Sequence, residues 1–99
     1  MKQTKELKEW AEMVKARDGN RCVICGKEAG KGSGKGLNAH HILPKEQIAT
    51  RFDIGNGITL CPKHHKFSNE MSAHKNPFVF YRWLFIHRNA QYCYILTKL

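Results

Sequence analysis

The spacing of cysteine and histidine most constrains what this chain can fold into. Two residues separate the thiols of Cys22 and Cys25, and a second pair with the same gap follows at Cys61 and His64. A Cys-x-x-Cys turn lets two thiolates reach one tetrahedral zinc ion, and Gly26 behind it relaxes the backbone as the chain leaves the turn. The pattern predicts a zinc knuckle that joins two distant parts of the chain.

A stabilising cross-link of this kind is expected because the chain has only 99 residues. Chains of this size bury roughly 60–65% of the surface of the unfolded form, so the hydrophobic core is modest. The four cysteines and six histidines could act as disulfides or as metal ligands. The N-terminus is charged, and no apolar run approaches the roughly 18–20 residues of a membrane span. We therefore expect a cytoplasmic protein with no membrane partner, in which metal is favoured over disulfide.

Two alternatives compete with this interpretation of the zinc site. A redox Cys-x-x-Cys would belong at a strand-to-helix junction, and the Gly-, Ser- and Lys-rich segment 27–36 that follows here cannot start a helix. Cys93 competes with His64 for the fourth zinc position, although its setting in YCYIL is more typical of a small core residue. On a helix His64 and His65 point about 100° apart, so His64 can close the zinc site while His65 faces elsewhere.

The charge balance points to a polyanionic partner. The chain has 17 Lys and Arg against 8 Asp and Glu, a net charge of +9. Solubility alone usually requires a magnitude of about 2–8, so nucleic acid is the first candidate partner. The candidate phosphate contacts are Lys27, Lys31 and Lys35 in the glycine-rich segment, with Lys63 and Lys66 beside the second ligand pair.

Apolar periodicity and turn residues predict an α+β fold. We expect a helix over 4–17 capped by Thr4, with Trp10 packing on its apolar face; short antiparallel strands over 37–43 and 58–60; a helix over 62–73; and, after the Asn76-Pro77 start, helices over 78–87 and 90–98. The segment 78–87, FVFYRWLFIH, is apolar nearly all round. It is predicted to be buried against the N-terminal helix, or else shared with a partner subunit.

A second constellation lies partly inside the 35 residues that separate Cys25 from Cys61. Ordinary zinc modules place their ligand pairs only about 12–20 residues apart. A purely structural zinc module has no need of the polar residues found in and just after this insertion, which are His40, His41, Asn56 and His65.

Together these motifs resemble the HNH endonucleases, also called ββα-metal or His-Me finger nucleases, over about residues 17–69. The matching stretches are CVIC, AHHI, GNGITLC and the HH of LCPKHH, and the short phage-type members look most similar. The resemblance implies a small ββα-metal finger, a two-stranded antiparallel hairpin plus helix, with a zinc knuckle. It implies one nuclease domain over 1–99, with an N-terminal helix (1–17), a zinc-stabilised core (18–73) and C-terminal helices (74–99).

The resemblance also implies roles in DNA hydrolysis. His41 would be the general base, and Asn56 would orient it by accepting a hydrogen bond from its ring. His40 and His65 would bind a catalytic divalent cation, with Asn69 at a position where many members have a further histidine. Neutral imidazole can accept a proton from water at physiological pH, and the cation serves as Lewis acid and leaving-group clamp. Such ligands suit Mn²⁺, Ni²⁺, Co²⁺ or Zn²⁺ better than Mg²⁺.

Competing functions stay open at this point. A non-catalytic, zinc-stabilised nucleic-acid-binding module would need only the zinc ligands and the lysines, and a phage-assembly interaction module would use the aromatic segment 78–87. The family's zinc-binding versions use four cysteines, so His64 is a departure. We expect DNA as partner in a bacterial or phage-infected cell, and a homodimer or a larger phage or restriction assembly for double-strand cutting. His74 and His87 have no partner spacing and are expected at the surface or at satisfied polar positions.

Overall fold

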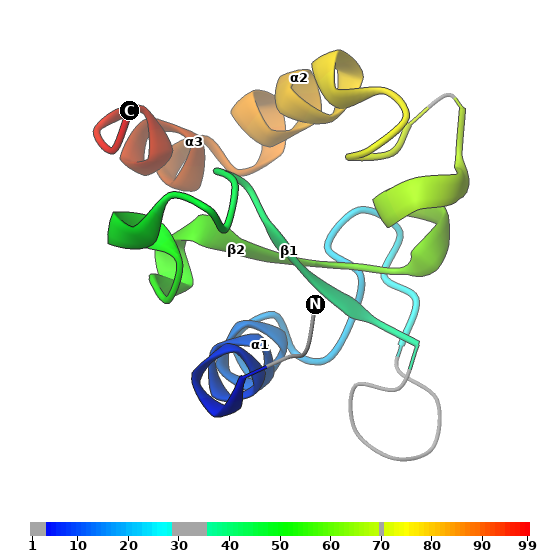
Figure 1. Cartoon of the computed structure of the whole chain (residues 1–99). Coiled ribbons are helices and arrows are strands. Elements are labelled where there is room, and N and C mark those ends of the chain that lie inside the picture. The colour runs from blue at the N-terminus through cyan, green and yellow to red at the C-terminus, as the bar shows by residue number, and fades with distance from the viewer. Residues whose placement is uncertain (1–3, 29–35, 70) are drawn as a thin grey trace.

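A two-stranded hairpin lies at the centre of the structure and positions the other elements (Figure 1). In the computed structural model, which describes residues 4–28, 36–69 and 71–99, β1 (Asn38–His41) pairs antiparallel with β2 (Gly57–Leu60). His41 is the last residue of β1 and lies opposite Gly57. The predicted α+β class with an antiparallel hairpin is confirmed.

Helix α1 (Lys5–Arg17) covers one face of the hairpin (Figure 1). The hydroxyl of Thr4 accepts a backbone hydrogen bond of 3.1 Å in the first turn, so the predicted N-cap is confirmed. Trp10 and Val14 are the buried residues of α1. A Cβ at Gly57 would lie 2.7 Å from Cζ2 of Trp10 and closer still to Val14, so glycine is needed for α1 to pack this closely.

Helices α2 (Pro77–His87) and α3 (Asn89–Leu96) lie on the other side of the hairpin (Figure 1). Asn76 caps α2 through its side chain, as predicted, and Pro77 is the first helical residue, one position before the predicted start at residue 78. The side chains that α2, α3 and β2 contribute to the buried core are Phe80, Leu84, Ile95, Ile58 and Leu60.

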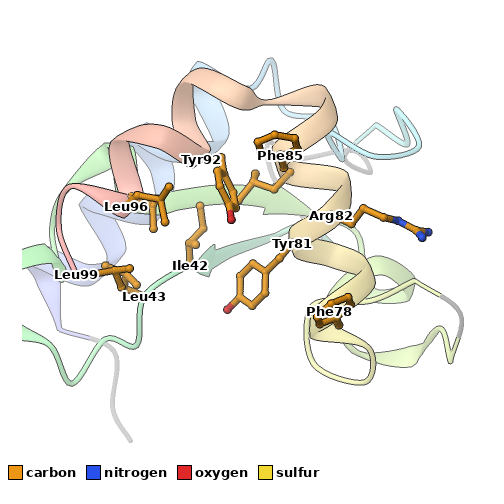
Figure 2. Close-up of a pocket in the computed structure, with 11 residues that line it drawn as sticks. Ile42, Leu43, Phe78, Tyr81, Arg82, Phe85, Tyr92, Leu96 and Leu99 are labelled. Carbon is orange, nitrogen blue, oxygen red and sulfur yellow. The ribbon is translucent and has the colours of Figure 1, made fainter.

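The prediction that segment 78–87 is buried against the N-terminal helix is wrong, because α1 and α2 lie on opposite sides of the hairpin (Figure 1). A sheet of two strands covers only one stripe of α2, and Phe78 stays 84% and Ile86 61% exposed. Exposed aromatic residues of α2, including Tyr81 and Phe85, border an apolar groove of about 740 Å³ that α3 closes on its other side (Figure 2).

The helix predicted over 62–73 is also wrong, because the described residues of this segment form only the π-helical turn η3 (Lys63–Phe67). The N–H of Ser68 donates to the carbonyl of Lys63 at 2.8 Å and closes this turn. The hydroxyls of Ser68 and Ser72 each accept a hydrogen bond of 3.0 Å from the backbone N–H three residues ahead. Serine side chains that bond to the backbone in this way favour turns over a continuing helix.

The loop between the strands carries two short 3₁₀ turns, η1 (Ile48–Thr50) and η2 (Ile54–Asn56). Among the described residues, no helix has the length and apolar character that crossing a membrane requires.

Candidate metal centres and active site

The first metal-ligand cluster joins the turn after α1 to the end of β2. The ligand atoms of Cys22, Cys25, Cys61 and His64 all lie within 4.8 Å of one another. The Sγ atoms of Cys25 and Cys61 are 3.8 Å apart, and Nδ1 of His64 is 3.8 Å from Sγ of Cys22 and 3.3 Å from Sγ of Cys61. A tetrahedral zinc ion, with bonds of about 2.3 Å to sulfur and about 2.0–2.1 Å to nitrogen, spaces its ligands about 3.5–3.8 Å apart. The donor set therefore fits one tetrahedral metal ion in a zinc-knuckle arrangement.

Backbone hydrogen bonds shape the knuckle around these thiols. Gly26 has a positive φ of 76° and donates its N–H to the carbonyl of Cys22 at 2.8 Å. The N–H of Cys22 donates to the carbonyl of Lys27 at 2.9 Å, and the N–H of Val23 donates to the carbonyl of Thr59 in β2 at 3.0 Å. The knuckle is thus attached to the hairpin even apart from a metal ion.

Cys93 lies elsewhere, so both predictions for it are wrong. It is exposed on α3, and its thiol lies 3.6 Å from the side-chain oxygen of Asn89. It is neither the fourth ligand, a place that His64 occupies, nor a core residue.

Burial raises the pKa of the Cys22 thiol to about 11, so a metal ion would supply the positive charge that keeps it a thiolate.

A second cluster consists of three imidazoles from three segments: His40 from β1, His65 from η3 and His74 from the loop before α2. Their ligand atoms lie within 4.8 Å of one another, and Nε2 of His74 is 3.0 Å from Nε2 of His65. The ring of His40 lies edge-on to both, with centroid distances of 5.1 and 5.2 Å. Two nitrogens bound at a right angle with bonds of about 2.1 Å lie about 3.0 Å apart. The three rings therefore could hold a divalent cation.

His74 reaches this cluster because the chain reverses direction after η3, where its N–H donates to the carbonyl of His65 at 3.0 Å. No spacing in the sequence links His74 to other ligands, so sequence reasoning missed it. The helix predicted over 62–73 would place Asn69 one turn after His65 on the same face, but Asn69 lies beyond the end of η3 and is exposed. The available signal was the turn-favouring pair Ser68-Asn69.

Two rings of this cluster are held neutral by their surroundings. Burial, followed by the charges of His65 and His74, lowers the pKa of His40 to about 3. Burial, followed by the charges of His74 and Lys66, lowers the pKa of His65 to about 4. Neutral imidazole has the free lone pair that a metal ion needs, so the site is prepared for a cation rather than for protons.

His41 lies beside the cluster but outside it. Its Nε2 donates to the carbonyl of Arg51 at 2.9 Å, which leaves Nδ1 with a free lone pair. The indole of Trp10 stacks on the ring with centroids 3.9 Å apart and planes 10° from parallel. Burial lowers the pKa of His41, and the hydrogen bond to Arg51 opposes this in part. A neutral, oriented ring with one free nitrogen can accept a proton.

Asn56 is fully buried and acts on the backbone around His41. Its Oδ1 accepts from the N–H of Leu43 at 2.7 Å, and its Nδ2 donates to the carbonyls of Leu43 at 3.1 Å and Thr50 at 3.2 Å. The predicted hydrogen bond between the Asn56 amide oxygen and the ring of His41 is therefore wrong. Asn56 instead holds the loop that presents the Arg51 carbonyl to His41.

One pocket of about 460 Å³ brings the histidines together. Its walls include four imidazoles and two ammonium groups, those of His40, His41, His65, His74, Lys45 and Lys66. Of the predicted phosphate contacts, Lys66 lines this pocket, whereas Lys27 and Lys63 are exposed and do not line it. Lys31 and Lys35 lie outside the described residues. Lys45 was missed because it precedes η1 with no motif to mark it.

Comparison with known proteins agrees with this geometry. A family model described as HNH endonuclease matches residues 22–69, from the first cysteine of the knuckle to just beyond η3. Searches of curated proteins and of solved structures find no significant match. Trp10 and His74 lie outside the matched segment. With its antiparallel hairpin, its Cys/His knuckle and its ordered histidines and asparagine, the segment 22–69 belongs to the HNH endonuclease family.

Proposed function

We propose that the protein is a metal-dependent endonuclease that hydrolyses phosphodiester bonds of DNA. The observation that carries this proposal is the meeting, in one pocket, of a three-imidazole cluster and a fourth imidazole, His41, that is held apart from it. A structural zinc module has no use for either feature. The net charge of +9 supports binding to a phosphate backbone.

Each residue of the pocket has a chemical task in this proposal. His40, His65 and His74 would hold a divalent cation, which when bound supplies Lewis-acid stabilisation of the phosphate and of the leaving 3′ oxygen. Nδ1 of His41 takes a proton from water as the water oxygen bonds to phosphorus and the bond from phosphorus to the 3′ oxygen breaks. The carbonyl of Arg51, facing Nε2–H, stabilises the imidazolium that results.

The two clusters differ in the ions that they suit. Three thiols and one imidazole are soft donors in a closed tetrahedral set, so we propose Zn²⁺ as a structural ion at Cys22, Cys25, Cys61 and His64. The imidazole cluster suits Mn²⁺, Co²⁺, Ni²⁺ or Zn²⁺ better than Mg²⁺. A reducing cytoplasm, bacterial or phage-infected, would keep the thiols free to bind metal.

Cleavage of supercoiled plasmid tests the proposal. Wild-type protein with Mn²⁺ or Mg²⁺ is expected to convert plasmid to the open-circular form, and EDTA is expected to stop it. His41→Ala is expected to lose about 10²–10⁴-fold in rate, whereas His87→Ala, exposed on α2, keeps it. Equal plasmid loss with wild type and His41→Ala would indicate a contaminating nuclease. Binding without cleavage under any metal would favour the non-catalytic module, and either result would remove the proposal.

A further inference from the structure

The indole of Trp10 stacks on the ring of His41 and is itself held by a hydrogen bond to the backbone. Its ring lies 3.9 Å from the imidazole, centroid to centroid, with the planes 10° from parallel. Its Nε1 donates to the carbonyl of Asp53 at 2.8 Å, and the side chain is only 4% exposed. The indole therefore has a fixed position. It belongs to α1, which lies outside the segment that matches the HNH family.

The hairpin makes room for this contact at Gly57. Gly57 lies opposite His41 in the antiparallel register. A Cβ at this position would lie 2.7 Å from Cζ2 of Trp10 and would force the indole away. The stack between α1 and the end of β1 therefore depends on a residue without a side chain at the paired position of β2.

Trp10 and Arg51 constrain the imidazole in complementary ways. The hydrogen bond to the Arg51 carbonyl restrains one atom of the ring, Nε2, but a rotation of the ring about its Cβ–Cγ bond would break it. The stacked indole fixes the plane of the ring. With both contacts in place, Nδ1 of His41 has a single position and direction.

We infer that Trp10 is a positioning residue for His41, through which α1 holds the imidazole in the orientation needed to take a proton from water. The inference rests on the proposed nuclease function. Displacing a reacting group by about 1 Å can cost about 10²-fold in rate, so loss of the indole is expected to lower turnover while leaving DNA and metal binding in place.

Val14 offers a matched control for the structural role of Trp10. It is fully buried on the same helix and also packs against Gly57. No aromatic or hydrogen-bonding group on Val14 can orient His41. Val14→Ala therefore weakens the same interface between α1 and the hairpin without removing the indole that stacks on the imidazole.

The test measures kcat and KM for cleavage of a synthetic DNA duplex with Mn²⁺ by wild type, Trp10→Leu, Trp10→Phe and Val14→Ala. Trp10→Leu is expected to lose at least about tenfold in kcat with KM within about twofold. Trp10→Phe, which can still stack but lacks the bond to Asp53, is expected to recover most of that loss. Val14→Ala is expected to melt at a lower temperature but to keep its kcat. A folded Trp10→Leu protein with wild-type kcat, or an equal kcat loss in Val14→Ala, would overturn the inference.

A second measurement separates this inference from the nuclease proposal. In NMR spectra at one fixed pH, the Nε2–H proton of His41 is expected to be visible in wild type, Trp10→Phe and Val14→Ala, and to be lost by solvent exchange in Trp10→Leu. If wild type never cuts DNA, the nuclease proposal fails. An undiminished Nε2–H signal in Trp10→Leu would show that the indole does not fix the ring.

Discussion

The carbonyl oxygen of Arg51 accepts a hydrogen bond from Nε2 of His41 at 2.9 Å, so a backbone group sets the tautomer of this ring. Replacing the Arg51 side chain cannot remove a backbone carbonyl. The position of the Arg51 carbonyl depends on the loop between the strands, and Asn56 holds that loop through hydrogen bonds to Leu43 and Thr50. Asn56 therefore acts on His41 indirectly, through the loop that carries the Arg51 carbonyl.

Removing the Asn56 side chain is therefore expected to damage stability and cleavage together. Asn56→Ala leaves buried backbone groups of Leu43 and Thr50 without partners, so the free energy of unfolding should fall by about 2–4 kcal/mol. Urea denaturation measures this loss, and plasmid cleavage should fall with it. Asn69→Ala, exposed beyond η3, is the control and should change stability by less than about 0.5 kcal/mol. Equal stability of Asn56→Ala and wild type would contradict the assigned hydrogen bonds.

His74 should contribute to divalent-cation binding, and Asn69 should not. His74 belongs to the three-imidazole cluster, so His74→Ala is expected to weaken Co²⁺ binding by about tenfold or more, measured by the visible absorption of the bound ion. Asn69→Ala and His87→Ala should bind Co²⁺ as wild type does. If Asn69→Ala weakened binding and His74→Ala did not, the ligand role that the family resemblance implies for Asn69 would be restored.

The knuckle ion should be needed for folding, and the imidazole cluster should not. Cys22→Ser removes a buried ligand and is expected to unfold or aggregate the protein, whereas Cys93→Ser, exposed on α3, should fold normally. His65→Ala is expected to fold with its zinc ion retained and its cleavage lost. Elemental analysis and circular dichroism measure both properties. Loss of zinc from His65→Ala would show that His64 and His65 had been assigned to the wrong clusters.

Stability should also fall at low pH through Asp18. Burial alone would raise the pKa of this carboxyl, but hydrogen bonds from Arg17 and the Thr59 N–H, with the charges of Arg17 and Arg88, outweigh burial and lower it. A lowered folded pKa stabilises the protein fully above the unfolded value of about 3.9, and this contribution is lost as the pH falls through the folded value.

Asp18→Asn should therefore cost about 1–3 kcal/mol of unfolding free energy at pH 7 and flatten the acid limb of the stability curve. Glu12→Gln, exposed on α1, serves as control. An acid limb of the same slope in Asp18→Asn and wild type would contradict the role of Asp18.

Local chemistry made much of the fold predictable. The Cys-x-x-Cys and Cys-x-x-His spacings placed four ligands together because a single turn brings such pairs within reach of one ion. Thr4 and Asn76-Pro77 marked true helix starts because capping acts within a few residues. Gly57, by contrast, carried no sign that its bare Cα accommodates Trp10, since that contact joins segments far apart in the sequence.

The features that sequence reasoning missed depend on where the chain turns back. His74 joins His65 only because η3 ends at Phe67, and helix ends are set by competing serine hydrogen bonds that periodicity does not register. The contacts of Asn56 depend on the path of a loop. The exposure of Phe78 depends on the width of the sheet, which a single apolar segment does not specify.

The central claim is that His41 accepts a proton while the imidazole cluster binds the cation. It is tested most directly by measuring Mn²⁺ affinity and DNA cleavage on the same His41→Ala preparation. We predict wild-type affinity for Mn²⁺, because His41 lies outside the cluster, and a cleavage rate lower by about 10²–10⁴-fold. Loss of Mn²⁺ binding, or cleavage at the wild-type rate, would contradict the assignment of His41 as a general base held off the metal.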